Sequence, residues 1–129
     1  MKKVLFKDKY PIFVTTILKS ETEFKNTNEI VDKLKEEVQK HPIASLIAVF
    51  DHLEHTKNLN EHDFLDDLID AKNLIFCFGK EILTSQILAL RPRSIGVCEF
   101  EDRFEISFLE VPKEKPQKTV ESWIEGLRT

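Results

Sequence analysis

The sequence predicts an α+β fold with one mixed sheet of four or five strands and helices mainly on one face. Three observations support this prediction. Strand-like apolar runs alternate with stretches in which apolar residues recur at helical spacing. After residue 94 the hydrophobic period changes to two, which is typical of a β-hairpin. The length of 129 residues is that of one domain, so residues 1–129 are expected to share one core.

The first half of the chain predicts two strands joined by a helix. Ile12–Leu18 is rich in β-branched residues and is expected to form a strand. A helix capped by Asn26 or Asn28 should follow and stop before Pro42. Ile43–Phe50 is almost continuously apolar, as expected of a strand that is covered on both faces. The apolar residues at helical spacing are Ile30, Val31, Leu34 and Val38.

The second half predicts three helices and three strands. His62–Asp70 and Glu81–Leu90 have amphipathic helical spacing, and a buried strand, Leu74–Phe78, separates them. Ile95–Phe100 and Phe104–Leu109 are expected to pair as a hairpin. The predicted order is therefore β-α-β-α-β-α-β-β-α. The last helix begins at Thr119, with an apolar stripe made by Val120, Trp123, Ile124 and Leu127.

Composition excludes several classes of partner. The net charge of -4 and the scattered basic residues argue against nucleic acid, whose binding requires a basic surface. No standard nucleotide-binding loop is present. The apolar run that follows Lys2 and Lys3, Ile12–Leu18, is too short and too polar for a secretory signal or a membrane span. We therefore expect a cytoplasmic protein that binds neither nucleic acid nor membrane.

An Asp-His pair with a second histidine nearby is the first candidate site. Asp51 and His52 follow an apolar run, and His55 lies three residues further on. On one helical turn the two imidazoles share a face, so with Cys77 or a carboxylate they can ligate a metal ion. Alternatively, His52 acts as an acid–base group, with Asp51 orienting its ring. The simplest interpretation is a half-buried His52 at a strand end, with His55 on the surface.

The segment Arg91-Pro92-Arg93-Ser94 is the second candidate site. Two guanidinium groups around a rigid proline can bind a carboxylate or phosphate bidentately. The alternative is a plain helix-to-strand connection, in which Arg91 interacts with the helix dipole and Arg93 pairs with an acidic neighbour. This segment is the best anion-binding candidate in the chain.

The runs VFDHLEHT, NLIFCFG and RPRSIGVCEFEDRFEISFLEVP, in this order, resemble the small bacterial proteins of domain-of-unknown-function family three-hundred-and-two. The likeness covers roughly residues 10 to 112 and rests on order and spacing. Asp51-His52 falls on that family's Asp-His pair and Phe78-Gly79 on the start of its second motif. Lys80-Glu81 and the Arg-Pro-Arg-Ser segment depart from the pattern. The resemblance implies a compact α+β fold and small homo-oligomers, but no established activity.

Three functions are compatible with these observations. The leading hypothesis is a non-enzymatic protein that oligomerises, with a dimer as the expected form, or binds a small anionic ligand. The polar contacts would then be Asp51, His52, His55, Arg91 and Arg93. The second is a metal-binding protein that uses His52 and His55 with Cys77. The third is a small enzyme in which His52 transfers protons and Arg91 or Arg93 holds an anionic substrate.

Overall fold

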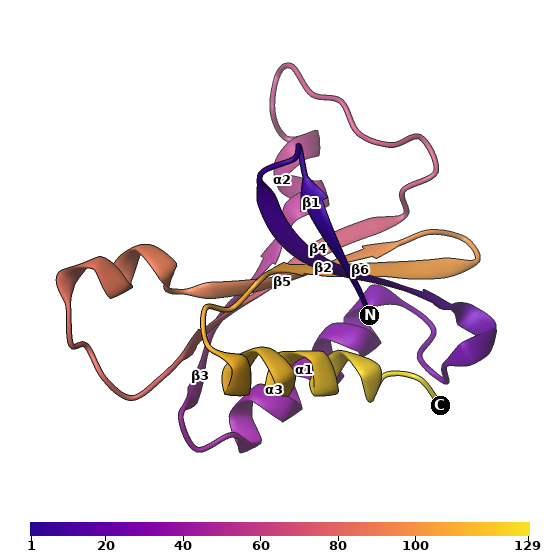
Figure 1. Ribbon diagram of the computed structural model, residues 1–129. Helices are drawn as coiled ribbons and strands as arrows, with labels where there is room; N and C mark the ends of the chain where they lie inside the picture. Colours follow the sequence, from indigo (N-terminus) through magenta and orange to yellow (C-terminus); the bar gives the residue numbers. More distant parts are fainter.

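A computed structural model describes residues 1–129, and in it the chain forms an α+β structure around one six-stranded sheet (Figure 1). All neighbouring strands are antiparallel, in the order β1-β2-β6-β5-β4-β3. None of the helices has the length and apolarity that crossing a bilayer requires. The strands are β1 (Lys2–Phe6), β2 (Tyr10–Leu18), β3 (Ala44–Asp51), β4 (Asp70–Phe78), β5 (Arg93–Glu99) and β6 (Arg103–Leu109). The α-helices are α1 (Thr27–Lys40), α2 (His52–Lys57) and α3 (Glu114–Glu125), and 3₁₀ helices span Lys19–Glu21 and Ser85–Leu90.

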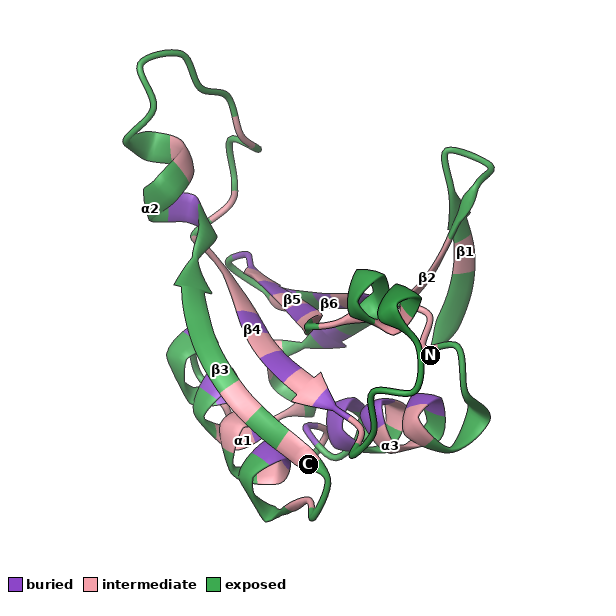
Figure 2. Ribbon diagram, turned by 90° about the vertical axis from the view of Figure 1, so that its left-hand side faces the viewer, coloured by how far each residue is buried: buried purple, intermediate pink, exposed green.

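Helices α1 and α3 lie on the same face of the sheet, and the core lies between them and the strands (Figure 2). Alternation along the strands places every second residue in this core. Leu74, Phe76 and Phe78 on β4 and Ile95 and Val97 on β5 are buried there. The opposite face carries neither α1 nor α3, and we call it the open face. The surface of the sheet is thus divided into a covered side and an uncovered side.

The predicted sheet was wrong in strand number, strand direction and element order. No strand was predicted before Ile12, and Lys7 and Asp8 interrupt the apolar run that precedes it. Both residues instead adopt positive φ, 53° and 58°, and form the turn of the β1–β2 hairpin. The observed order is β-β-α-β-α-β-β-β-α when the 3₁₀ helices are left aside. Because no long helix crosses between neighbouring strands, every pairing is antiparallel.

Two of the predicted helices do not form. Residues 58–69, which include most of the expected helix His62–Asp70, run as a loop from α2 to β4. The expected helix Glu81–Leu90 is an extended segment that ends in the 3₁₀ helix Ser85–Leu90. Each stretch has apolar residues at helical spacing but is not covered by a second layer, and packing of an apolar face is what stabilises most helices in proteins. Amphipathic spacing alone was therefore misleading.

Strand β3 is also not the doubly covered strand expected for Ile43–Phe50. It lies at the edge of the sheet, pairs only with β4, and is exposed over most of its length. A register shift between Leu46 and Ala48 places an extra residue, Ile47, at a bulge. Bulges of this kind are common at sheet edges. Continuous apolar character here does not mean burial on both sides.

Helix α3 is held against the sheet by its tryptophan. Trp123 lies 5.8 Å, centroid to centroid, from the rings of both Phe76 and Phe78. The His41 ring, just beyond α1, lies 6.0 Å from Trp123 and 4.7 Å from Phe78. Ile124 beside it is fully buried. The last helix therefore covers the sheet of its own chain.

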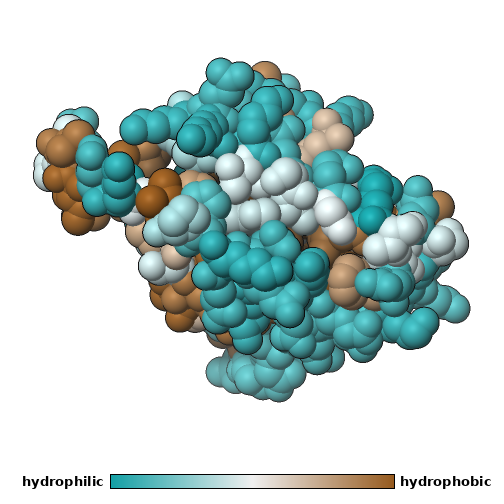
Figure 3. All heavy atoms as spheres, turned by 90° about the horizontal axis from the view of Figure 1, so that it is seen from below, coloured by the Kyte–Doolittle hydropathy of each residue, from teal (hydrophilic) through white to brown (hydrophobic).

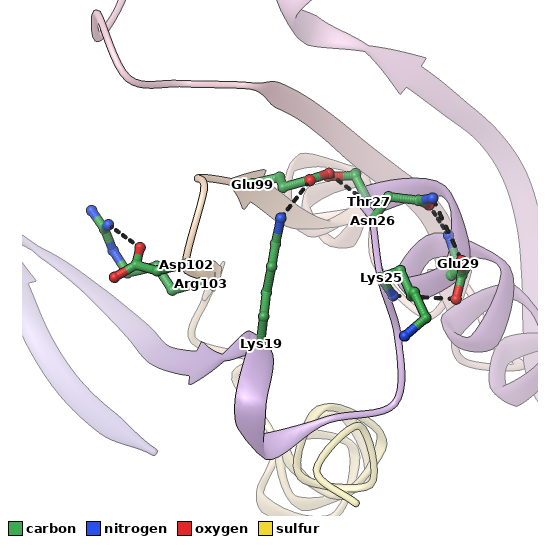
Figure 4. A network of polar contacts seen from close by, with 8 residues as sticks. All are labelled: Lys19, Lys25, Asn26, Thr27, Glu29, Glu99, Asp102 and Arg103. Carbon is green, nitrogen blue, oxygen red and sulfur yellow. Dashed lines mark hydrogen bonds and ion pairs between the residues drawn. The ribbon is translucent and has the colours of Figure 1, made fainter.

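A buried carboxylate joins the other end of α1 to the sheet (Figure 4). Glu99, at the end of β5, accepts hydrogen bonds from the backbone N–H of Thr27 at 2.9 Å and from Lys19 Nζ at 2.8 Å. The Thr27 hydroxyl also donates to it, at 3.2 Å. The Asn26 side chain caps the same helix by accepting from the backbone N–H of Glu29. Glu99 thus adds a negative charge to a helix N-terminus, where the helix dipole favours it.

The pKa of Glu99 makes the stability of the fold depend on pH. Burial alone raises this pKa, but the hydrogen bonds from Lys19 and Thr27, with the attraction to the Lys19 ammonium, bring it below its usual value. The unfolded chain then binds the proton more tightly, so this contribution is complete above the ordinary glutamate pKa of about 4.3 and is lost as the pH falls through the folded pKa. Urea unfolding between pH 7 and 3 should show a steeper acid loss for the wild type than for Glu99→Gln. Parallel curves for the two proteins would contradict this prediction.

Candidate functional site

A hollow on the surface lies at the centre of the open face. Asn73 on β4 lies opposite Gly96 on β5, which in turn lies opposite Ser107 on β6. These residues and Ser94 form the polar floor of a cavity of about 350 Å³. Of its lining residues only Phe108 is buried, so the cavity opens to solvent. The rim consists of Ile12 and Leu109 on the sheet and Ala89, Leu90, Pro92 and Arg93 beside it.

Gly96 leaves space in the floor of this cavity. A Cβ atom added there would lie 3.6 Å from Asn73 Nδ2, 3.7 Å from the Ser107 carbonyl oxygen and 3.8 Å from Ser107 Oγ. These are ordinary van der Waals distances, and the backbone of Gly96 lies in a regular strand. Packing within the chain therefore does not require glycine here. Glycine inside a strand is common where a ligand or another backbone comes close.

Arg93 fixes one wall of the cavity and carries a charge that no acidic group neutralises. Its guanidinium donates to the backbone carbonyls of Leu90, Leu109 and Glu110, the last at 3.0 Å. No carboxylate forms an ion pair with it, so the expected pairing with an acidic neighbour is not found. Burial lowers the pKa of Arg93, which nevertheless remains charged at neutral pH. A half-buried cation beside a polar cavity favours an anion.

Arg91 lies near the end of the segment that connects β4 to β5. We call residues 79–92 the arm, because they project beyond the ends of β4 and β5 (Figure 1). Arg91 Nη1 donates to the carbonyl oxygen of Glu81 at 2.7 Å, which ties the end of the arm to its beginning. Its guanidinium also lies against Gly79, where φ is +128° and an added Cβ would be 2.4 Å from Nη2. Arg91 and Arg93 line a second, smaller cavity of about 70 Å³ together with Lys113.

Asp51 and His52 have different roles at the end of β3. The Asp51 carboxylate caps the short helix α2 by accepting from the backbone N–H of Glu54 at 3.1 Å. His52 Nδ1 lies 2.8 Å from Asn73 Oδ1, and Asn73 Nδ2 donates to Ser94 Oγ at 2.9 Å. A histidine that donates to the amide oxygen through Nδ1 keeps Nε2 as an acceptor in its neutral form. His52 is thereby connected to the floor of the open-face cavity.

The metal-binding and acid–base arrangements do not assemble around these histidines. His55 packs near Phe50 and its ring centroid is 6.3 Å from that of His52, but no third ligand joins them. Cys77 lies opposite Ser45 in the sheet and belongs to no group of three metal-binding side chains. His52 lines a separate cavity of about 290 Å³ under the loop 58–69, and Arg93 does not reach it.

Cys98, on the floor of that 290 Å³ cavity, is held in its thiol form. Burial raises its pKa, and the negative charges of Glu105 and Asp70 raise it further. A thiol with a raised pKa is a weak nucleophile at neutral pH. Neither the 350 Å³ cavity nor the 290 Å³ cavity therefore contains an activated cysteine nucleophile.

The whole chain matches the model of one protein family. The model of a family of unknown function, DUF6858, matches residues 1–129. The chain belongs to this family. The resemblance to domain-of-unknown-function family three-hundred-and-two is not confirmed. No curated protein and no solved structure matches the chain.

In this DUF6858 protein the sequence pointed to Arg93 and His52 but missed the residues between them. Asn73 was assigned to the approach to a strand, whereas β4 already begins at Asp70. From that start, alternation places Asn73 on the open face, beside Gly96. The available signal was a glycine in the middle of a strand, flanked in the next strand by Ser107.

Proposed function

We propose that this protein is a non-enzymatic binding protein that holds a small organic anion in the open-face cavity. The observation that supports the proposal is one site with three properties: a charged Arg93 without an acidic partner, a polar floor, and an apolar rim. A volume of about 350 Å³ lies within the range of about 300–1,000 Å³ that is common for small-molecule sites. The anion would lie beside Arg93 and the apolar body against the rim.

The floor of the open-face cavity offers hydrogen-bond donors to a ligand. The Ser94 hydroxyl accepts from Asn73, which leaves its own proton free to donate to a ligand. The Ser107 hydroxyl lines the same floor. The link from His52 through Asn73 fixes the orientation of the amide. A polar group on the ligand would therefore meet donors that are already held in place, which lowers the entropic cost of binding.

A substitution that fills the open-face cavity tests this proposal directly. In Gly96→Leu the new side chain would occupy the floor, whereas Gly96→Ala adds one methyl group at distances that the site accommodates. Benzoate and phenyl phosphate, with benzamide as the uncharged control, are suitable first probes in isothermal titration. We expect an anionic probe to bind the wild type and Gly96→Ala, and to bind Gly96→Leu at least about tenfold more weakly, a change of about 1.4 kcal/mol.

Two outcomes would contradict the proposal. Benzamide binding as tightly as benzoate would show that the charge of Arg93 has no part in recognition. Equal binding to Gly96→Leu and Gly96→Ala would place the site elsewhere on the chain. Circular dichroism of both variants establishes that they keep the wild-type fold.

A further inference from the structure

Three basic side chains line a cavity of about 200 Å³ at the base of the arm, and we call it the arm cavity. Lys80 lies at the start of the arm, Arg91 near its end, and Lys113 immediately before α3. They meet because α3 begins close to the base of the arm (Figure 1). No residue lines both this cavity and the open-face cavity. The apolar part of its lining consists of Ile43, Phe78 and Pro116.

None of these three cations is neutralised by a carboxylate of the chain. Acidic residues outnumber basic ones, 23 to 19, yet Lys80, Arg91 and Lys113 form no ion pair. Glu81, the one acidic residue in the lining, is not within ion-pair distance of any of them. The arm cavity therefore has an excess of positive charge.

The guanidinium of Arg91 is held in position and keeps donors for a ligand. It lies against the backbone of Gly79, where no Cβ atom intervenes, and Nη1 donates to the carbonyl oxygen of Glu81. This is its only hydrogen bond within the chain, so the N–H groups on Nε and Nη2 have no acceptor there. A guanidinium can bind two oxygens of a phosphate at once, and its fixed position lowers the entropic cost of doing so.

The charge and size of the arm cavity favour a small phosphorylated ligand. A phosphate monoester carries a charge of about −1.5 to −2 at pH 7, whereas a carboxylate carries a single charge. Three cations around one hollow therefore stabilise the phosphate more. The volume of about 200 Å³ is below the range of about 300–1,000 Å³ that is common for drug-sized ligands. Only a small molecule, or the phosphorylated end of one, fits.

We propose that the arm cavity binds the phosphoryl group of a small molecule. Arg91 would bind two of its oxygens, and Lys80 and Lys113 would neutralise the remaining charge. Both lysines are exposed, so a ligand can reach them from solvent. Seen from the side of α1 and α3, the arm stands out from a mostly hydrophilic surface (Figure 3). This site is distinct from the open-face cavity and its ligand.

Titration of isotope-labelled protein with inorganic phosphate, followed by heteronuclear NMR, tests the site and locates it. We expect the backbone amides of Gly79, Lys80 and Lys113 to shift on binding. Methyl phosphate should bind at least as tightly as inorganic phosphate, because the apolar wall can contact its methyl group. Acetate, the singly charged control, should bind at least about tenfold more weakly.

Two double variants separate a local site from an effect of net charge. Lys80→Gln/Lys113→Gln should raise the dissociation constant for phosphate at least about tenfold. Lys115→Gln/Lys118→Gln removes the same charge near the start of α3, but neither residue lines the cavity, so its effect should stay below about threefold. Circular dichroism establishes that both variants keep the wild-type fold.

Three results would overturn this proposal. Absence of saturable shifts up to about 10 mM phosphate would show that the arm cavity does not bind it. Equal weakening by the two double variants would mean that only net charge matters. Phosphate binding that Gly96→Leu abolishes would place the anion in the open-face cavity. Benzoate titration reports on the open-face cavity separately, so failure of one proposal does not imply failure of the other.

Discussion

Replacing Glu99 by alanine is expected to lower the free energy of unfolding by roughly 3 kcal/mol. The substitution removes the acceptor for the Thr27 backbone N–H and leaves the Lys19 ammonium, whose side chain is largely buried, without its partner. Hydrogen bonds to a charged group contribute about 1.5–3 kcal/mol each, and a donor left unsatisfied in the interior adds a desolvation cost. Urea unfolding at pH 7 gives the difference.

Glu101→Ala is the matched control for this prediction. Glu101 lies two residues away, is exposed, and its side chain makes neither a hydrogen bond nor an ion pair. Its replacement should change the stability by less than about 0.5 kcal/mol. A Glu99→Ala protein that is as stable as Glu101→Ala would mean that the carboxylate is not part of the cap of α1. Glu99→Gln should fall between the two, because the amide oxygen can still accept from Thr27.

Truncation of Trp123 is expected to cost still more, about 3–5 kcal/mol. This side chain fills the space between α3 and the rings of Phe76 and Phe78, so alanine would leave a cavity that a rigid sheet cannot close. Unfolding followed by far-ultraviolet circular dichroism measures the loss, since the variant has no other tryptophan to serve as a fluorescent reporter.

Two further substitutions make the tryptophan prediction specific. Trp123→Phe keeps an aromatic ring in contact with the cluster and should cost less than Trp123→Ala. Lys118→Ala changes a side chain on the exposed face of the same helix and should be nearly neutral. If Trp123→Ala loses no more stability than Lys118→Ala, α3 does not contribute to the core as the structure indicates.

The sequence correctly predicted those elements in which a regular hydrophobic spacing begins or ends at a clear local signal, such as a helix cap or a polar turn. Asn26 caps α1, and all four apolar residues expected on its inner face are buried. The hairpin of β5 and β6 was found because its alternation ends at a polar turn, Glu101-Asp102. In both cases a local signal and the packed layer agree.

The parts that failed depended on what covers each segment, which a single sequence does not state. The loop 58–69 and the arm have helical spacing but no second layer over them, and neither forms an α-helix. The N-terminal strand was missed because the turn that precedes Tyr10 uses Lys7 at positive φ rather than glycine. For the site, Arg93 was identified as a charge, but two of its three carbonyl partners, Leu109 and Glu110, lie 16 and 17 residues further along the chain. Local sequence cannot reveal such contacts.

The strand order has a consequence for the way this chain folds. β2, near the N-terminus, has β6 as its second neighbour, and the pair Ile12 and Leu109 are among the most distant contacts in the sequence. During synthesis from the N-terminus, the β1–β2 hairpin must therefore remain undocked until β6 has been made. Sheets built from such non-local pairs fold slowly, because the entropy of closing a long loop is lost before the contacts form. The last fifth of the chain thus determines when the first hairpin joins the sheet.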